Sequence, residues 1–351
     1  MKIFELMDQA IEAKASDIHL TVKVPPLMRV DGALVPMPGR EVLEIEKIKE
    51  LVNEILTEKQ KLMLEEKGEL DTSYSKAGVG RFRVNTYIQR GSLAVALRVV
   101  NSRIPDLEEL GLPESVRGLT KKKRGLILVT GPTGSGKTTT LASMINIINS
   151  EREEHILTLE DPIEYLHNHK KSMVNQREIG SDSKSFANGL RAALRQDPDV
   201  ILVGEMRDLE TIAIAITAAE TGHLVLSTLH TLGAGKTIDR VVDVFPPYQQ
   251  EQIRVQLAAV LEGIISQQLI AKKSGVGRVG AFEVLTVTNA VRNLVREGKT
   301  YQIPSVIQTG AKYGMVSMDK AIERLYKNAE ISKDKAMFYA FDPDNIKKTL
   351  Y

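Results

Sequence analysis

The sequence contains no cysteine and no tryptophan, and only 5% of its 351 residues are aromatic. The absence of cysteine excludes disulfide bonds and thiolate-ligated zinc or iron–sulfur centres within this chain. The low aromatic content leaves few side chains on which nucleic-acid bases could stack. Neither sign of charge is in excess, because 47 Lys and Arg residues are balanced by 45 Asp and Glu residues. Any anion-binding site must therefore be local.

Long uninterrupted hydrophobic runs are also missing. The N-terminal segment carries Glu5 and Asp8 among apolar residues at helical spacing, unlike the apolar core of a signal peptide. The most apolar window, residues 211–229, is interrupted by Glu220 and Gly222, so it is predicted to be a buried helix followed by a strand. We therefore expect a cytoplasmic chain without a membrane span, which meets the membrane only through partners.

The first hundred residues have the pattern of a mixed domain. Apolar residues typical of strands occur over residues 81–88 and 92–100, on either side of a turn signal. A helical stretch, residues 41–66, interrupts the strands. The sequence therefore predicts an N-terminal α+β domain over residues 1–100.

Residues 101–118 contain Pro and Gly without a long periodic run, and are predicted to connect this domain to a second one over residues 119–351. Short apolar runs alternate there with helical patterns, which is typical of an α/β fold whose parallel sheet is covered on both faces. From about residue 260 the chain is predicted to be mostly helical. The apolar runs are 125–130, 156–159, 200–203 and 224–227, and the later helical patterns include 290–297 and 318–330.

A phosphate-binding loop is predicted at residues 131–138, which read GPTGSGKT and match G-x-x-x-x-G-K-[ST] between an apolar strand and a helix. Glycines in such a loop let backbone N–H groups surround phosphate oxygens at the positive end of the helix. Lys137 is predicted to reach the β- and γ-phosphates of ATP, and the Thr138 hydroxyl to bind Mg²⁺. The predicted nucleotide contacts are Gly131, Gly134, Ser135, Gly136, Lys137, Thr138 and Thr139, with Glu160 and His230 from later strands.

A second segment, PDVILVGEMRD at residues 198–208, resembles a Walker B strand with Gly204 where an aspartate is usual. A phosphate loop binds nucleotide but does not activate water, so an acidic residue must supply that chemistry. Glu205 follows the strand, at the sheet edge where ligands bind, and we predict that it orients and deprotonates the attacking water. The alternative is that Glu205 only caps the strand or pairs with Arg207.

Two further strand ends carry polar residues. LTLEDPIE at residues 157–164 places Glu160 and Asp161 after a strand, and either could hold Mg²⁺ through water in place of the missing aspartate. His223 precedes and His230 follows another strand, and both could lie on the nucleotide side. His230 is either a sensor of the γ-phosphate or a satisfied structural histidine.

These motifs together resemble the secretion ATPase superfamily, and within it the retraction ATPases of type IV pili. The resemblance covers nearly the whole chain. It rests on SDIHL and PPLMRVDG near the N-terminus, the phosphate loop, LEDPIE, the glycine-containing Walker B element, the two histidines and AVRNLVREGK at residues 290–299. It implies a PAS-like N-terminal domain, a RecA-like ATPase domain, and a homo-hexamer at the inner-membrane platform of the pilus machine, on the inner face of the cytoplasmic membrane.

The function implied by the resemblance is an ATP-hydrolysing motor for pilus retraction and twitching motility. Pilus-extension and type II secretion ATPases of the family look longer at the N-terminus, and many carry a four-cysteine zinc site, so a short cysteine-free chain favours retraction. A nucleotide-gated scaffold with little hydrolysis is an alternative that the intact Glu205 argues against. A nucleic-acid motor would use the basic run KKKR at residues 121–124, but the balanced charge argues against it.

Two arginines of the N-terminal domain are candidate catalytic groups. If Arg90 and Gly91 form a two-residue turn, Arg83 lies opposite Arg98, and an anion would relieve the repulsion between them. Because the family places N-domain arginines near nucleotide at a subunit interface, we expect Arg83 and Arg98, with Arg81 nearby, to act on a neighbouring subunit's nucleotide. The alternative is a solvated sheet face with local carboxylate partners.

Two other patterns leave alternatives open. The helix predicted over residues 290–297 places Arg292 and Arg296 away from its apolar face, so it is either a coupling surface or simply amphipathic. The tripeptide HNH at residues 167–169 could contribute to a metal site, but without further ligands an exposed loop is the better interpretation.

Overall fold

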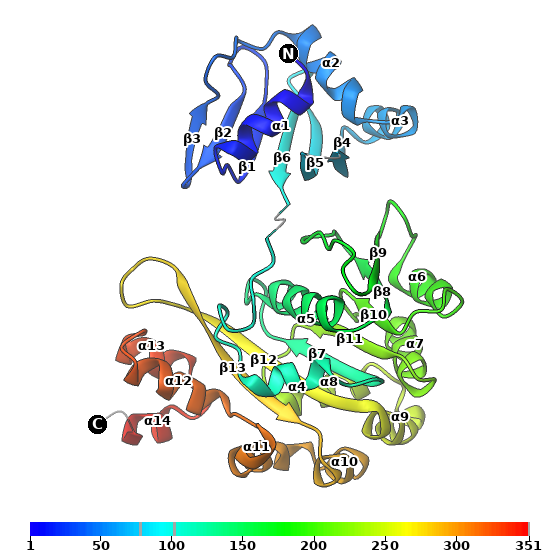
Figure 1. Cartoon of the computed structure of the whole chain (residues 1–351), viewed down its shortest axis with the longest axis vertical. Coiled ribbons are helices and arrows are strands. Elements are labelled where there is room, and N and C mark those ends of the chain that lie inside the picture. Colours follow the sequence, from blue (N-terminus) through cyan, green and yellow to red (C-terminus); the bar gives the residue numbers. More distant parts are fainter. Residues whose placement is uncertain (77–78, 101–102, 350–351) are drawn as a thin grey trace. The chain divides into compact units, whose positions relative to one another are not determined.

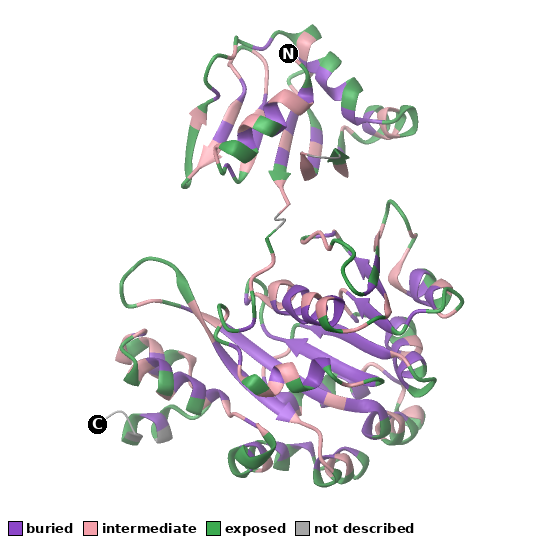
Figure 2. Ribbon diagram, in the orientation of Figure 1, coloured by how far each residue is buried: buried purple, intermediate pink, exposed green. Residues whose placement is uncertain are grey.

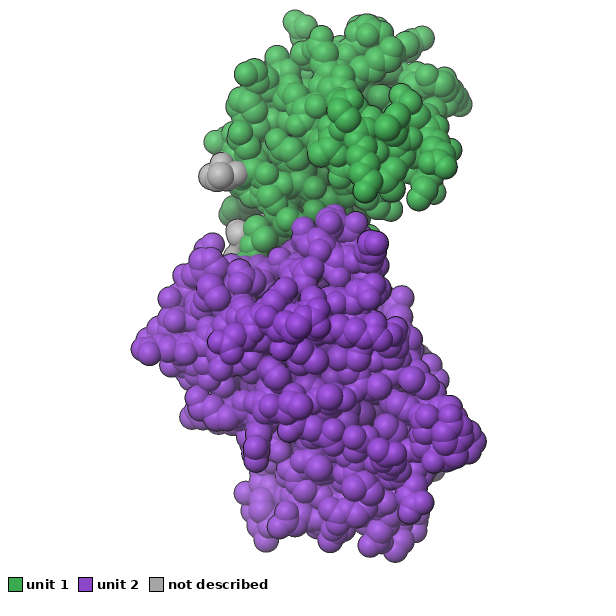
Figure 3. Space-filling model, turned by 90° about the vertical axis from the view of Figure 1, so that its right-hand side faces the viewer, with its two compact units in different colours: residues 1–103, 164–166 green, residues 104–163, 167–351 purple. Residues whose placement is uncertain are grey.

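The computed structural model of the chain describes residues 1–76, 79–100 and 103–349. They form two compact units, coloured separately in Figure 3: unit 1 comprises residues 1–103 and 164–166, and unit 2 comprises residues 104–163 and 167–351. Each unit has a hydrophobic core of its own.

The predicted connection, residues 101–118, lies mostly within unit 2. Residues 101 and 102 are outside the described residues, and the rest of the connection belongs to unit 2 from Ile104 onward. Leu107, Leu112 and Val116 are buried there in one hydrophobic cluster. A segment without a long periodic run therefore still packs against unit 2 through isolated apolar side chains.

Unit 1 is an antiparallel sheet with helices packed on it (Figure 1). Its elements are α1 (Ile3–Glu12), β1 (Asp17–Leu20), β2 (Leu27–Val30), β3 (Ala33–Pro36), α2 (Ile45–Ile55), α3 (Glu58–Lys67), β4 (Glu69–Lys76), β5 (Gly80–Gln89) and β6 (Ser92–Val99). The strand order is β3-β2-β1-β6-β5-β4. Side chains alternate between the two faces of a strand, and Ile18, Phe82 and Leu97 are buried in one core with the apolar sides of α1 and α2.

The predicted helical stretch over residues 41–66 is two helices. The first ends at Ile55, and Thr57 is the N-cap of the second: its hydroxyl accepts a hydrogen bond from the Gln60 backbone N–H, and the Gln60 side chain accepts one from the Thr57 N–H at 2.8 Å. This capping box satisfies two N–H groups that a helix start leaves unpaired, so a new helix begins where the periodicity alone continues.

Unit 2 contains the longer sheet. Its elements are α4 (Glu114–Thr120), β7 (Gly125–Thr130), α5 (Lys137–Glu151), β8 (His155–Glu160), β9 (Met173–Glu178), α6 (Phe186–Ala193), β10 (Val200–Val203), α7 (Leu209–Glu220), β11 (Leu224–Leu229), α8 (Ala234–Asp243), α9 (Pro247–Val260), β12 (Leu261–Ala271), β13 (Arg278–Thr286), α10 (Asn289–Arg296), α11 (Ile303–Thr309), α12 (Met318–Lys327), α13 (Lys333–Tyr339) and α14 (Pro343–Thr349). The strand order is β13-β12-β7-β11-β10-β8-β9. Each neighbouring pair is parallel except β12 with β13.

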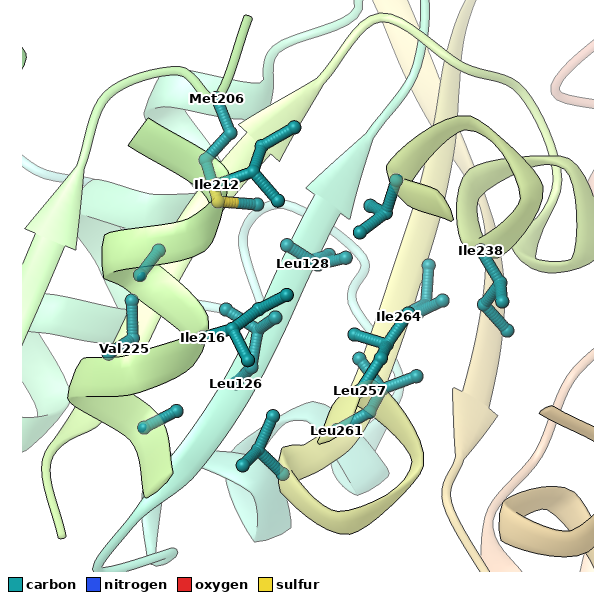
Figure 4. Packing of buried hydrophobic residues seen from close by; sticks show 14 of the residues in the cluster. Leu126, Leu128, Met206, Ile212, Ile216, Val225, Ile238, Leu257, Leu261 and Ile264 are labelled. Atoms are coloured by element: carbon teal, nitrogen blue, oxygen red, sulfur yellow. The ribbon is translucent and has the colours of Figure 1, made fainter. Parts of the chain in front are cut away.

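Alternate residues of β7 enter two cores, one on each face of this sheet. Leu126 and Leu128 pack in a cluster with Ile216 of α7 (Figure 4). Ile127 and Val129 belong to the other cluster, together with apolar residues of α4 and α5. The strands are therefore buried on both faces (Figure 2), which explains their continuous apolar runs. The predicted parallel sheet between two helical layers is confirmed.

The prediction of mostly helix from residue 260 is wrong for residues 261–286, which form the β12–β13 hairpin. Leu261, Ile264 and Ile265 recur at a helical spacing, but β12 lies between β7 and β13 and is buried on both faces. A strand in that position has no period-two pattern that would distinguish it from a helix. The helices predicted further on are present as α10 and α12.

The apolar window at residues 211–229 is a helix followed by a strand, as predicted: α7 ends at Glu220 and β11 begins at Leu224. Among the described residues, none of the helices has the length and apolar content needed to cross a bilayer.

Candidate active site

The predicted site residues of unit 2 follow strands that lie side by side. Thr130, the last residue of β7, pairs with Leu229, the last of β11. Val203, the last residue of β10, pairs with Leu159 near the end of β8. Because these strands are parallel, the segments that follow them emerge at one edge of the sheet, where α/β proteins bind ligands.

The phosphate loop begins under steric constraint. Gly131 has φ +146°, and a Cβ built on it would lie 2.2 Å from the main-chain oxygen of Gln267 on β12. Such contact is shorter than any real Cβ contact, so only glycine fits between β7 and β12 at this position. Gly136, with φ +89°, is the N-cap of α5, and the loop therefore ends at a helix N-terminus.

Lys137 is the first residue of α5 and extends back over the loop. Its ammonium donates hydrogen bonds to the carbonyl oxygens of Gly131 at 3.0 Å and Pro132 at 3.1 Å. Thr138 follows it in the first turn of the helix and is half-buried. The ammonium thus lies at the beginning of the loop, where phosphate oxygens could replace the two carbonyls as its acceptors.

Glu205 is held between two basic side chains. One carboxylate oxygen lies 2.7 Å from Arg207 Nη2, and the other lies 3.1 Å from His230 Nε2. His230 Nδ1 lies 3.3 Å from the hydroxyl of Thr133 in the phosphate loop. With Nε2 donating to the carboxylate, Nδ1 of a neutral imidazole accepts from the Thr133 hydroxyl. One histidine therefore links the acidic residue to the loop. The contact with Arg207 is present, and the role of Glu205 in orienting and deprotonating water stays a prediction.

Two opposing effects act on the pKa of Glu205. Burial raises it, but the hydrogen bonds from Arg207 and His230 and the positive charge of Arg207 outweigh burial, so the pKa lies below the usual glutamate value. Glu205 is therefore a carboxylate at neutral pH, able to accept a hydrogen bond from water. The same pairing raises the pKa of Arg207.

Glu160 and Asp161 differ in their surroundings. Glu160 is buried, and its Oε1 accepts hydrogen bonds from Thr158 Oγ1 at 2.6 Å and Gln176 Nε2 at 3.0 Å. Asp161 is exposed, and its charge contributes to the raised pKa of Arg207, which places it on the Glu205 side of the edge. Both can offer oxygen ligands, which Mg²⁺ prefers.

Gly204 lies against the end of β8. Its N–H donates to the Leu159 carbonyl at 2.8 Å, and a Cβ at this position would lie 3.2 Å from that same oxygen. Its own carbonyl accepts from Thr228 Oγ1 at 2.7 Å. A side chain at position 204 would require the end of β8 to shift by a few tenths of an ångström, whereas glycine fits there without a shift.

His223 does not lie with the other site residues. It precedes β11, and its main-chain oxygen accepts from the N–H of Gly125, the first residue of β7. His223 is therefore at the edge of the sheet opposite to the phosphate loop. Its Nδ1 lies 2.9 Å from the Ala218 carbonyl near the end of α7, a structural contact. The expectation that both histidines lie on the nucleotide side is wrong for this one, because β11 runs the full depth of the sheet between them.

The other polar patterns have structural partners. His167 donates its backbone N–H to Gln176 Oε1, and His169 Nδ1 accepts from the Val174 N–H. No group of three potential metal-ligating side chains occurs in the described part of the chain. In the basic run, Lys122 pairs with Glu262 and Lys123 with Glu154.

The arginines of unit 1 have the register that the sequence predicts. Arg90 and Gly91 both have positive φ and join Gln89 to Ser92, and Arg83 pairs with Arg98 across β5 and β6. Arg98 Nε lies 3.0 Å from Asp17 Oδ1, but the Arg98 side chain is 68% exposed, so this ion pair is weak.

Arg81 and Arg83 differ in what holds them. Arg81 donates to the hydroxyls of Ser73 and Ser75. Arg83 is exposed, and no hydrogen bond or ion pair joins its side chain to another of the described residues. Of the three arginines, Arg83 therefore requires the least rearrangement to meet an anion.

Arg292 has a structural role in unit 2. It donates to the carbonyls of Ala258 and Ala259 at the end of α9, and to Glu262 at 2.6 Å. The carbonyls at a helix end lack intrahelical partners, so Arg292 caps α9. Arg296 makes an exposed contact to Asn293. The amphipathic interpretation of α10 is supported by the burial of Val291 and Val295.

Sequence reasoning missed two residues of this site. Thr133 is an unspecified position of the loop pattern, and only its proximity to His230 marks it. Gln267 lies on the strand that was predicted as helix, and its side chain contacts Ser135 of the phosphate loop and Thr140 of α5. No local pattern could have found either residue, because both contacts join distant segments.

Comparison with known families decides where the chain belongs. The family model described as "Type II/IV secretion system protein" matches residues 2–332. The chain belongs to this family. The resemblance to the secretion ATPase superfamily is thereby confirmed.

Relatives within the type II/IV secretion family align along most of their length. "Type IV pilus retractation ATPase PilT" of Pseudomonas aeruginosa is 48% identical over 99% of this chain and 100% of its own. "Twitching motility protein" of Neisseria gonorrhoeae is 47% identical over 89% of this chain and 83% of its own. A crystal structure of the pilus retraction motor PilT with bound ADP, 51% identical, covers 99% of both chains with a TM-score of 0.91. The predicted fold class, a PAS-like α+β domain joined to a RecA-like P-loop domain, is confirmed.

Proposed function

We propose that this chain is a motor subunit that hydrolyses ATP and uses the energy to retract type IV pili. The observation that carries the proposal is the connection from Glu205 through His230 to Thr133 of the phosphate loop. It places an ionised carboxylate one imidazole away from the loop that would hold the phosphates. Full-length similarity to a pilus retraction ATPase supports retraction as the direction of work.

Mg-ATP fits the residues at this edge. Glycine is required at Gly131 by close approach of β12, and the loop leads into the N-terminus of α5, a combination that suits phosphate oxygens. Thr138 would bind Mg²⁺ together with Glu160 or Asp161 through water, since Mg²⁺ takes few protein ligands beside substrate phosphates. When bound, Mg²⁺ neutralises charge on the phosphates. The other loop contacts would come from Gly134, Ser135, Gly136, Lys137 and Thr139.

The chain's own residues then divide the chemistry. Glu205 orients a water molecule and accepts its proton. His230 and Arg207 hold the carboxylate in place and keep it ionised. Lys137 supplies positive charge beside the phosphates.

The assembly that we propose is a homo-hexamer bound to the inner-membrane platform of the pilus machine, on the cytoplasmic side. Arg83 and Arg98 of one subunit would stabilise charge on the nucleotide of its neighbour. Arg83 is the better candidate because Arg98 has Asp17 as a partner. Mixing Arg83→Ala subunits with Lys137→Ala subunits tests this idea. Rings formed from the mixture should hydrolyse ATP faster than either variant alone, and a mixture no better than its components rejects action in trans.

The experiment that tests the function is a count of surface pili in the native host after deletion of the gene. Complementation with Glu205→Gln should leave long, abundant pili that do not retract, whereas wild type restores retraction. Bald cells would indicate an extension motor instead. Unchanged pili would reject both the retraction motor and the extension motor, and would favour type II secretion. If the purified wild type does not hydrolyse ATP, a nucleotide-gated scaffold is favoured.

A further inference from the structure

Gln267 joins β12 to the phosphate loop, a role that neither the motif nor the proposed chemistry assigns to it. The residue is 1% exposed. The amide nitrogen donates to the Ser135 carbonyl at 2.6 Å, and the amide oxygen accepts from the Thr140 hydroxyl at 2.9 Å. We propose that Gln267 is a positioning residue that holds the phosphate loop in the shape that binds nucleotide. The inference rests on the proposed function only in that the loop binds a nucleotide.

The geometry of one peptide group explains how this works. The Ser135 carbonyl and the Gly136 N–H belong to the same planar trans peptide and point in opposite directions. Gln267 attracts the carbonyl toward β12, so the Gly136 N–H is directed away from β12. A phosphate nest requires its N–H groups to converge on the anion, and this one hydrogen bond therefore sets the direction of one of them.

The loop has the freedom to lose that shape. Ser135 stands between Gly134, with φ +76°, and Gly136, with φ +89°. Glycines tolerate both signs of φ, so the peptide between Ser135 and Gly136 can rotate at small steric cost. Ser135 is 2% exposed, and water is therefore a poor substitute as donor to its carbonyl. Without Gln267 the Ser135 carbonyl lacks a hydrogen-bond donor, so we expect this peptide to rotate toward another donor. Nucleotide binding must then reverse the rotation.

Thr140 fixes the orientation of the Gln267 amide. A hydroxyl hydrogen donated to the amide oxygen leaves the NH₂ group facing Ser135. Thr140 lies one turn into α5, and its N–H bonds to the Gly136 carbonyl. The amide therefore spans from the loop to the helix that follows it, and a Cβ built on Gly136 would lie 3.3 Å from Gln267 Nε2, so the amide lies against the loop.

The test is ADP binding by purified full-length chain carrying Gln267→Met, measured by calorimetry in the presence of Mg²⁺. Methionine has a side-chain volume similar to that of glutamine, but it cannot donate a hydrogen bond and is only a weak acceptor. The Kd for ADP should rise about ten- to a hundredfold, which at 1.4 kcal/mol per tenfold is in the range for one buried acceptor left unpaired. KM for ATP should rise likewise while kcat at saturating ATP stays within about threefold, because the bound loop has the native shape.

Gln268→Met is the matched control. Gln268 is the next residue on β12, is also buried, and donates to the Tyr339 carbonyl rather than to the loop. Gln268→Met should lower the thermal unfolding midpoint about as much as Gln267→Met does, without changing the Kd for ADP. If Gln267→Met folds and binds ADP within about twofold of wild type, or if Gln268→Met weakens ADP equally, the proposal is wrong.

Thr140→Val keeps the test decisive if Gln267→Met does not fold. Removing the orienting hydroxyl should raise the Kd for ADP about threefold to tenfold, and an unchanged Kd overturns the proposal. Where both single variants fold, the double variant should bind no more weakly than Gln267→Met, because the two changes break one connection; additive losses would contradict this. Wild type that binds ADP without hydrolysing ATP would refute the proposed function but not the role of Gln267.

Discussion

Replacement of Glu205 by glutamine separates chemistry from binding at the candidate site. The amide keeps the shape of the side chain but cannot accept a proton from water. General base catalysis contributes about 10²- to 10⁴-fold in rate, which corresponds to about 3 to 5 kcal/mol of activation free energy. We therefore expect kcat for ATP hydrolysis to fall by at least about a hundredfold.

The same substitution should cost little stability. Glutamine can still accept one hydrogen bond, from His230 or from Arg207, and loses the other. The Arg207 side chain is 75% exposed, so its ion pair with Glu205 is worth about 1 kcal/mol or less. The affinity for ADP should stay within about threefold of wild type, because the phosphate loop itself is unchanged.

Steady-state phosphate release and ADP titration measure the two effects separately. Glu210→Gln is the matched control, since Glu210, in the first turn of α7, also pairs with an arginine, but with Arg191 of α6 rather than with His230. It should leave kcat unchanged. A Glu205→Gln chain that assembles normally and retains more than about a tenth of the wild-type kcat would refute Glu205 as the base.

Three further predictions concern other parts of unit 2. Arg292→Glu should lower the free energy of unfolding by about 3 kcal/mol, because it places a carboxylate beside Glu262 and uncaps α9. The control Arg296→Glu should change that free energy by less than about 0.5 kcal/mol. Equal denaturation midpoints for the two variants would contradict the capping role. Burial lowers the pKa of His167 to about 4, so the unfolded chain binds more protons below pH 6.5, and stability should fall by about 2 kcal/mol between pH 7.5 and pH 5. His167→Gln should remove that part of the pH dependence, and an identical dependence in both chains would show that His167 is not its source. Gly131→Ala should weaken ADP binding by more than about a hundredfold, because the new Cβ would collide with the main-chain oxygen of Gln267. Near-normal affinity would mean that β12 can move away from the loop at little energetic cost.

Local patterns were sufficient for the strands that carry the site. β7, β8, β10 and β11 are short apolar runs bounded by turn residues or by helical patterns, and each was predicted within a few residues of its observed bounds. The polar residues that follow these strands were also predicted, because a phosphate loop or an acidic residue directly after a buried strand is a local sequence pattern. The Arg83–Arg98 register followed from the two-residue turn at Arg90, since turn length sets strand pairing.

Other features depended on long-range contacts. β12 resembles a helix in its sequence because it is buried on both faces, and only its place between β7 and β13 makes it a strand. The break between α2 and α3 is instead local, because Thr57 and Gln60, three residues apart, form reciprocal hydrogen bonds that apolar periodicity does not reveal. Residues of the predicted connection joined unit 2 because Leu107 and Val116 found apolar partners there.

The sequence by itself determined the chemical groups of this protein: a phosphate loop, a carboxylate after a Walker B strand, and histidines at both ends of the next strand. Only the tertiary structure decided which of them meet. Strand order brings His230 between Glu205 and Thr133, while the length of β11 places His223 at the opposite edge. Gln267 and Ser135 are 132 residues apart and share a hydrogen bond. Such pairings follow from sheet register and burial, which act through space, and spacing along the chain does not encode them.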